Sequence, residues 1–204
     1  HLGMSGRLSF KKNPLYLDKH DHFAIGLNNN IFIVFNDPRR FGLIDVITKK
    51  ELVNYKYLKH LGVEPLKKNF SYKLLKKIIF NRKSNIKNIL LNQRLIAGIG
   101  NIYACESLYE SKISPFKIAN TLNKKQITYL CLNIKKVLKK AISLRGSSIN
   151  DYKSPSGQLG NFQNNFKVYD REGKICKNKK CKKKIIRSVI NGRSTYYCES
   201  CQKI

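Results

Sequence analysis

Four cysteines near the C-terminal end constrain the fold of this chain most. They form two close pairs, Cys176-x4-Cys181 and Cys198-x2-Cys201, separated by sixteen residues. Two such pairs joined by a hairpin-length spacer can place four thiolates around one tetrahedral zinc ion. Residues 174–204 contain too few apolar side chains for a core, so metal binding would supply their folding free energy. The spacing therefore predicts a structural zinc site.

The alternative interpretation is a pair of disulfides in a secreted protein. It is disfavoured because the chain is rich in lysine and shows no recognisable secretion signal. Cys105 and Cys131 lie at apolar helical positions, which predicts that they are buried core residues.

The charge balance favours a polyanionic partner. Lys and Arg total 41 against 12 Asp and Glu, a formal net charge of +29 on 204 residues. Nucleic acid is the default partner for such a chain, and a membrane surface is the weaker alternative. The abundance of Lys, Asn and Ile also suggests an AT-biased genome, which would account for part of the excess charge. No apolar run approaches the roughly 20 residues of a membrane span.

The first part of the chain, to about residue 48, has the pattern of β-structure. Large apolar residues recur at every second position in 23–27 and in 31–35, on either side of the turn signal 28–30, which predicts a hairpin. Residues 36–38 interrupt the pattern, and 42–47 are predicted to resume as a strand.

A helical period follows. Apolar stripes predict helices at 74–79 and 86–90, and a long amphipathic helix at 127–141 with lysines on its outer face. The polar segment 143–161 contains Gly, Ser and Pro, which predicts a loop.

The segment 93–101 joins two of the predicted helical stretches through Gly98 and Gly100. Asn101 is predicted to cap the helix 102–110, and a helix N-terminus with free N–H groups can hold a phosphate. The alternative is an ordinary helix–helix turn.

The loop Asp37-Pro38-Arg39-Arg40-Phe41-Gly42 joins the two β segments. An aromatic side chain beside two guanidinium groups can wedge between base steps while the cations hold phosphates. The alternative is a salt-bridged turn with a half-buried Phe41.

Taken together, the motifs resemble one family, the formamidopyrimidine-DNA glycosylases, and the resemblance covers essentially the whole chain. The motifs that occur in the family's order are His1-Leu2-Gly3-Met4-Ser5-Gly6, Lys19-His20-Asp21-His22, the loop 37–42, Leu61-Gly62-Val63-Glu64-Pro65-Leu66, Gly98-Ile99-Gly100-Asn101-Ile102-Tyr103 and Gly192-Arg193-Ser194-Thr195-Tyr196-Tyr197-Cys198.

The resemblance implies an α+β fold in three parts. Residues 1–48 would be the C-terminal part of a β-sandwich, 49–165 a helix-two-turn-helix domain, and 166–204 a zinc β-hairpin. It also implies base excision repair: removal of oxidised purines such as 8-oxoguanine from damaged double-stranded DNA, followed by cleavage of the abasic strand. The protein would be a monomer of the bacterial cytoplasm with one structural zinc and no membrane partner.

Site residues follow from the same resemblance. Met4, Arg39 and Phe41 match the residues that fill the gap left by the flipped base, with Arg39 facing the orphaned cytosine. The loop 147–162 resembles the one that folds over the flipped base.

The remaining matched residues contact DNA. His1, Asn101 and Arg193 resemble phosphate clamps, and Arg193 also matches the proposed catalytic proton donor of the second elimination. Further DNA contacts are implied for His20, Arg40, Arg82 and Lys87.

One departure bears on activity. The family's nucleophile is an N-terminal proline amine, followed by a catalytic glutamate and, later, a catalytic lysine, and all three would precede His1. A covalent amine step needs an unprotonated nitrogen in the pocket. The expectation is therefore an N-terminally incomplete glycosylase that is inactive as given. Two alternatives stay open: a non-catalytic damaged-DNA-binding module, and a glycosylase of the endonuclease VIII branch, which prefers oxidised pyrimidines.

Overall fold

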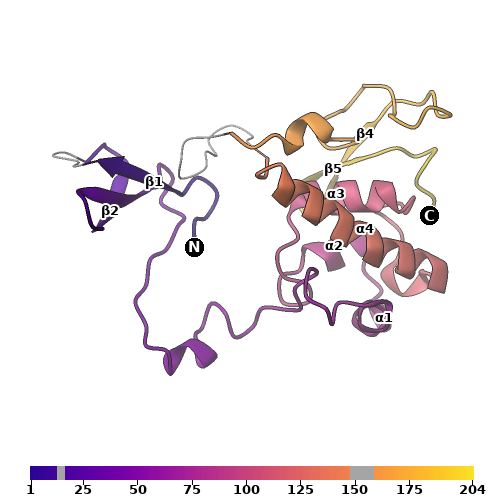
Figure 1. Cartoon of the computed structure of the whole chain (residues 1–204). Helices are drawn as coiled ribbons and strands as arrows, with labels where there is room; N and C mark the ends of the chain where they lie inside the picture. Colours follow the sequence, from indigo (N-terminus) through magenta and orange to yellow (C-terminus); the bar gives the residue numbers. More distant parts are fainter. Residues whose placement is uncertain (13–16, 148–158) are drawn as a thin grey trace. The chain divides into compact units, whose positions relative to one another are not determined.

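The computed structural model describes residues 1–12, 17–147 and 159–204 (Figure 1). The chain divides into two compact units, 1–50 with 141–165, and 51–140 with 166–204. The three-part division predicted from the sequence stays a prediction. Within the described residues, no helix combines the length and apolar character needed to cross a membrane.

The first unit contains a three-stranded antiparallel sheet in the order β1-β3-β2. Its strands are β1 (Arg7–Lys12), β2 (Asp21–Gly26) and β3 (Ile31–Asn36). The predicted hairpin is confirmed as β2 and β3. Asn29 and Asn30 adopt positive φ angles of 65° and 56° in its turn, a conformation that Asn tolerates better than most residues.

One face of this sheet is apolar and partly open. Direct cross-strand pairs share a face, and Ile33 lies opposite both Phe10 and Ile25. Phe10 is 55% exposed and Ile25 is 48% exposed. The sheet therefore presents large apolar side chains to its surroundings.

The strand predicted at 42–47 is wrong. Residues 41–48 have no strand assignment, and the N–H of Leu43 donates instead to the carbonyl of His1 at 2.8 Å. A run of apolar residues forms a strand only where a neighbouring strand pairs with its backbone N–H and C=O groups. Among the described residues, the loop pairs with the N-terminal turn rather than with a strand.

The second unit is mainly helical. Its helices are α1 (Tyr72–Ile79), α2 (Ile86–Leu91), α3 (Asn101–Glu110) and α4 (Lys124–Ser143), whose last turn passes into the first unit. Short 3₁₀ turns occur at Glu51–Asn54, Ala119–Thr121 and Phe162–Asn165. The periodicities that predicted helices at 74–79, 86–90 and 127–141 are confirmed.

Packing explains why these helices form. Apolar residues of α1, α2, α3 and α4 meet in one buried cluster that includes Leu75, Ile89, Leu108 and Ile134. Cys131 belongs to this cluster, as its helical position predicted.

The chain closes with a two-stranded hairpin of β4 (Ile186–Ile190) and β5 (Arg193–Tyr197). Asn191 and Gly192 turn between the strands with φ angles of 47° and 69°. A second buried cluster lies here and joins the cysteines to Cys105, Tyr109 and Val168. The hairpin region thus shares its small core with α3.

Candidate nucleic-acid interface and metal centre

In the first unit, the N-terminal turn is bound to the loop after β3 through Asp37. Its fully buried carboxylate accepts the Ser5 hydroxyl at 2.6 Å and the Gly42 N–H at 2.7 Å. The Ser5 hydrogen bond is the main cause that lowers the pKa of Asp37, so the group is a carboxylate near neutral pH. This carboxylate fixes the loop that carries the predicted DNA-contacting residues, and sequence reasoning assigned it no role.

The predicted gap-filling residues all lie on the two segments that Asp37 joins, the N-terminal turn and the loop after β3. Met4 is 77% exposed and Phe41 is 57% exposed. The Arg39 guanidinium lies 4.9 Å from the Phe41 ring centroid, a cation–π contact. Gly3 is required by the close approach: a Cβ there would lie 2.7 Å from the Phe41 carbonyl carbon, and its φ is +62°.

The other predicted DNA-contacting residues of this unit lie on or beside the same two segments. Arg40 is exposed, with a φ of 54°, and His1 is exposed as well. His20 is half-buried, and its carbonyl accepts the Asp37 N–H at 2.9 Å. The structure thus joins the motifs at residues 1–6, 19–22 and 37–42 by hydrogen bonds.

In the second unit, two predicted DNA contacts converge on one backbone carbonyl. The Asn101 amide Nδ2 donates to the Ser194 carbonyl at 2.9 Å, and Lys87 Nζ donates to the same oxygen at 3.1 Å. Arg193 is the exposed residue directly before this carbonyl. Helices α2 and α3 therefore hold the strand that presents Arg193.

Lys87 is fully buried, and its ammonium has neutral oxygens as hydrogen-bond partners. Besides Ser194, it donates to the Thr195 hydroxyl at 2.7 Å. Burial lowers the pKa of Lys87, and the nearby Arg193 charge lowers it further.

Asn101 does not cap the helix as predicted. Gly100 occupies the N-cap position, α3 begins at Asn101, and no side chain caps it. The reason is that the Asn101 amide is committed to Ser194, 93 residues away. Its Oδ1 is buried without a protein partner within the described chain.

The turn before α3 is held by Gln93, which sequence reasoning did not single out as a functional residue. Its amide bridges the Gly98 N–H at 2.8 Å and the Ile99 carbonyl at 2.9 Å. This shapes the Gly98–Gly100 turn. Arg82 lies exposed beyond α1, and its Nε donates to the Ile78 carbonyl at 2.8 Å.

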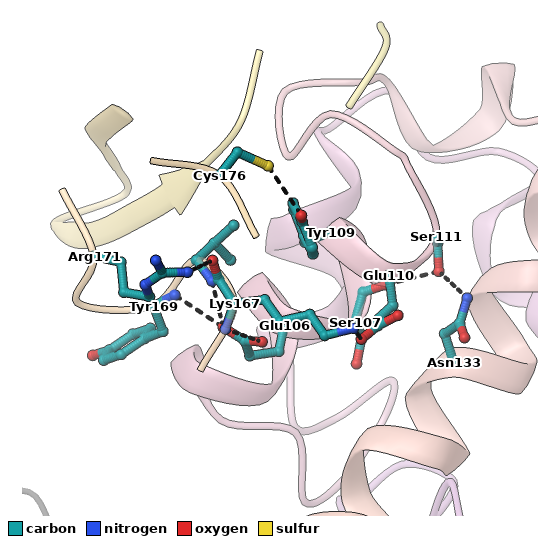
Figure 2. Close-up of polar contacts among 11 residues, drawn as sticks. Glu106, Ser107, Tyr109, Glu110, Ser111, Asn133, Lys167, Tyr169, Arg171 and Cys176 are labelled. Atoms are coloured by element: carbon teal, nitrogen blue, oxygen red, sulfur yellow. Dashed lines mark hydrogen bonds and ion pairs between the residues drawn. The ribbon is translucent and has the colours of Figure 1, made fainter. Parts of the chain in front are cut away.

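Glu106 on α3 is a buried carboxylate that accepts backbone N–H groups. Lys167, Val168 and Tyr169 donate to it at distances from 2.9 to 3.0 Å (Figure 2). Burial raises the pKa of Glu106, while these hydrogen bonds oppose the rise. Beside it, Lys167 and Glu110 form an ion pair at 2.5 Å. The segment entering the metal hairpin is thus fixed to α3.

The four predicted metal ligands come together. The Sγ atoms of Cys176, Cys181, Cys198 and Cys201 all lie within 4.8 Å of one another, with Cys176–Cys201 at 3.8 Å and Cys181–Cys198 at 3.7 Å. Zn–S bonds of about 2.3 Å in a tetrahedron place sulphur atoms about 3.8 Å apart. The cluster therefore fits one tetrahedral metal ion.

The thiols differ in their surroundings. A hydrogen bond from the Lys183 backbone leads the causes that lower the pKa of Cys181 to about 7, whereas burial raises the pKa of Cys198 to about 12. Metal binding to such a site would release protons, because the ligands are thiolates.

Known proteins decide the family. A formamidopyrimidine-DNA glycosylase from Zymomonas mobilis is 47% identical over 203 residues, which cover 100% of this chain and 73% of the relative. The chain belongs to the formamidopyrimidine-DNA glycosylase family. Another member, from Wolbachia pipientis of Culex pipiens, is 44% identical over 202 residues, 99% of this chain and 73% of its own length.

Family models and solved structures agree. Residues 1–44 match the formamidopyrimidine-DNA glycosylase N-terminal domain, and residues 61–153 match its H2TH domain. The MutM (Fpg) protein from Thermus thermophilus superimposes with a TM-score of 0.88 at 35% identity, over 99% of this chain and 74% of that one. The Lactococcus lactis Fpg, in complex with DNA containing an abasic site, gives 0.90 at 34% identity, over 100% and 74%.

These findings confirm the resemblance and the α+β fold class. The roles of the individual DNA-contacting residues stay predictions. The predicted capping loop falls mainly on residues 148–158, which lie outside the described residues.

Proposed function

We propose that this chain serves a base-excision DNA glycosylase and abasic-site lyase that removes oxidised purines from double-stranded DNA. Family membership supports the reaction class. The observation that carries the proposal is the convergence of Asn101 and Lys87 on the carbonyl next to Arg193. That arrangement fixes the strand that presents the exposed Arg193, whose guanidinium suits a phosphate of a distorted duplex.

Each predicted contact takes a role in this proposal. Asn101, Arg193 and His1 hold phosphates around the lesion. Met4, Arg39 and Phe41 enter the gap left by the flipped base, which their exposure allows. Arg193 also donates a proton in the second elimination. The supporting DNA contacts are His20, Arg40, Arg82 and Lys87.

The 204 residues are proposed to bind damaged DNA without excising the base. The family's chemistry needs a proline amine followed by glutamate, and no Pro-Glu pair occurs in this sequence. Without a positioned amine, no imine can form at C1′ of the lesion nucleotide.

The test is a pair of assays on the purified 204-residue polypeptide. Duplex carrying an abasic-site analogue should bind more tightly than undamaged duplex, as measured by fluorescence anisotropy. Borohydride trapping on an 8-oxoguanine:cytosine duplex should give no covalent product. Addition of an N-terminal segment that begins Pro-Glu should restore trapping. Equal binding to both duplexes would refute the damage-specific role, and robust trapping by the polypeptide alone would refute the assigned nucleophile.

Lesion choice has a second candidate. A mutant of the Lactococcus lactis Fpg has been solved with Fapy-dG DNA, and the wild-type protein with DNA containing an oxidised pyrimidine. Oxidised pyrimidines, the preference of the endonuclease VIII branch, are therefore the alternative substrate class. Competition between 8-oxoguanine and oxidised-pyrimidine duplexes for the restored protein would separate the two.

One zinc ion is proposed to bind Cys176, Cys181, Cys198 and Cys201, where it would supply folding free energy to the hairpin. Stoichiometric zinc is expected in freshly purified, reduced protein. Chelation should abolish DNA binding while helical circular dichroism largely remains, because the helices have a separate buried cluster. Purified protein with no bound zinc would contradict this.

We also propose that the protein is a monomer of the bacterial cytoplasm, in keeping with its bacterial relatives.

A further inference from the structure

Tyr109 connects α3 to the metal ligands. Its hydroxyl lies 3.0 Å from Cys176 Sγ, a contact that Figure 2 shows between the helix and the hairpin region. Tyr109 is 8% exposed and Cys176 is 5% exposed, so water does not compete well for either atom. The ring packs in the same buried cluster as Val168 and Ile185, which fixes where the hydroxyl points.

The direction of this hydrogen bond follows from the chemistry of the ligand. A metal-bound cysteine is a thiolate and has no proton to donate, so the tyrosine O–H must be the donor. Four thiolates around one divalent ion leave an excess of negative charge in a partly buried site. A donor aimed at one sulphur offsets that charge, as Asn178 also does for Cys201 at 3.3 Å.

We propose that Tyr109 is a positioning residue of the metal centre: its hydroxyl holds the Cys176 thiolate in place, slows loss of the metal and ties α3 to the hairpin. This inference rests on the proposed zinc site.

The consequence for DNA binding comes from the two ends of α3. Asn101 at its start bonds the Ser194 carbonyl beside Arg193, and Tyr109 near its end bonds a metal ligand. Glu106 lies between them and fixes the incoming segment at Val168. One rigid helix therefore connects retention of the metal to the position of the predicted phosphate clamp.

The test removes only the hydroxyl. Tyr109→Phe keeps the buried ring, and Tyr129→Phe removes a hydroxyl from a tyrosine on α4 that is 51% exposed. Zinc release into excess chelator, followed with a chromogenic indicator, should be about tenfold faster for Tyr109→Phe. Tyr129→Phe should match the unchanged protein. A Tyr109→Phe rate equal to that of the unchanged protein would overturn the proposal, because packing by the ring would then suffice.

A spectroscopic readout separates the hydroxyl from general destabilisation. With Co²⁺ in place of zinc, the sulphur-to-cobalt charge-transfer band should move to lower energy in Tyr109→Phe, because an unbonded thiolate holds its electrons less tightly. If Tyr109→Phe binds one equivalent of Co²⁺ and its spectrum is unchanged, the proposed role of Tyr109 is refuted and the metal site is not. Failure of the unchanged protein to bind either metal would instead refute the metal site itself.

Discussion

Lys87 is a buried cation whose hydrogen bonds go to neutral oxygens. Burial lowers its folded-state pKa below the ordinary 10.5. Between these two pKa values the unfolded state binds more protons than the folded state, so stability from this group rises with pH. At neutral pH the fold carries a desolvation cost here, which suggests that the charge is kept for binding rather than for stability.

Substitution of Lys87 by Met should separate its effect on stability from its effect on DNA binding. At neutral pH the melting temperature should be equal or higher, since Ser194 keeps its Asn101 partner and the Thr195 hydroxyl still donates to the Arg193 carbonyl. This advantage should shrink as the pH approaches 10.5. DNA binding should weaken about tenfold, because the Lys87 ammonium holds the Ser194 carbonyl beside Arg193 and adds positive charge behind it. Lys83→Met, at an exposed site four residues earlier, is the control; equal DNA binding by both variants would count against the role of Lys87.

Helix α3 binds three other segments of the second unit through Asn101, Glu106 and Tyr109. Glu106 accepts hydrogen bonds from three backbone N–H groups of the segment that enters the hairpin, those of Lys167, Val168 and Tyr169. Its removal would leave buried donors without partners, which costs far more than the loss of a surface contact.

Glu106→Ala should therefore lower the free energy of unfolding by about 3 kcal/mol. Glu106→Gln should cost less, because an amide oxygen can still accept hydrogen bonds. Urea unfolding at constant zinc concentration measures both. Glu64→Ala is the matched control, since the Glu64 carboxylate forms an exposed ion pair with Lys67 and its loss should change stability by less than about 1 kcal/mol. An unaltered midpoint in Glu106→Ala would show that the segment is held by packing.

Local sequence signals predicted the elements whose determinants are local. Apolar periodicity located α1, α2 and α4, and the asparagine run located the β2–β3 turn. The errors involved distant partners. Residues 42–47 are rich in the aliphatic residues typical of strands but have no neighbouring strand in the described chain. Asn101 could cap a helix, but its side chain bonds Ser194 instead.

The same contrast between local signals and distant partners holds for the candidate site. Cysteine spacing predicted the ligand set, because the ligand chemistry requires that pattern. Glu106 and Tyr109 escaped notice because their partners lie 61 to 67 residues away. Only a folded chain brings such pairs together.

For the whole molecule, the net charge of +29 makes the affinity for DNA depend on salt concentration. Phosphate contacts release counterions, so affinity should fall about a thousandfold between roughly 50 and 200 mM salt. Arg193→Ala should reduce the logarithmic salt slope by about one and weaken all sequences alike. Lys139→Ala, on the exposed face of α4, should leave the slope nearly unchanged if many lysines are merely solvated surface. A flat salt dependence would contradict phosphate clamping.

The open apolar face of the three-stranded sheet affects the tendency of the polypeptide to aggregate. Phe10 and Ile25 are exposed on strands that each pair on one side only among the described residues, a geometry that invites other chains to stack or add strands. At low ionic strength, mutual repulsion between highly cationic molecules keeps such faces apart. Added electrolyte screens that repulsion, so the polypeptide should begin to scatter light under the same ionic conditions that release it from DNA.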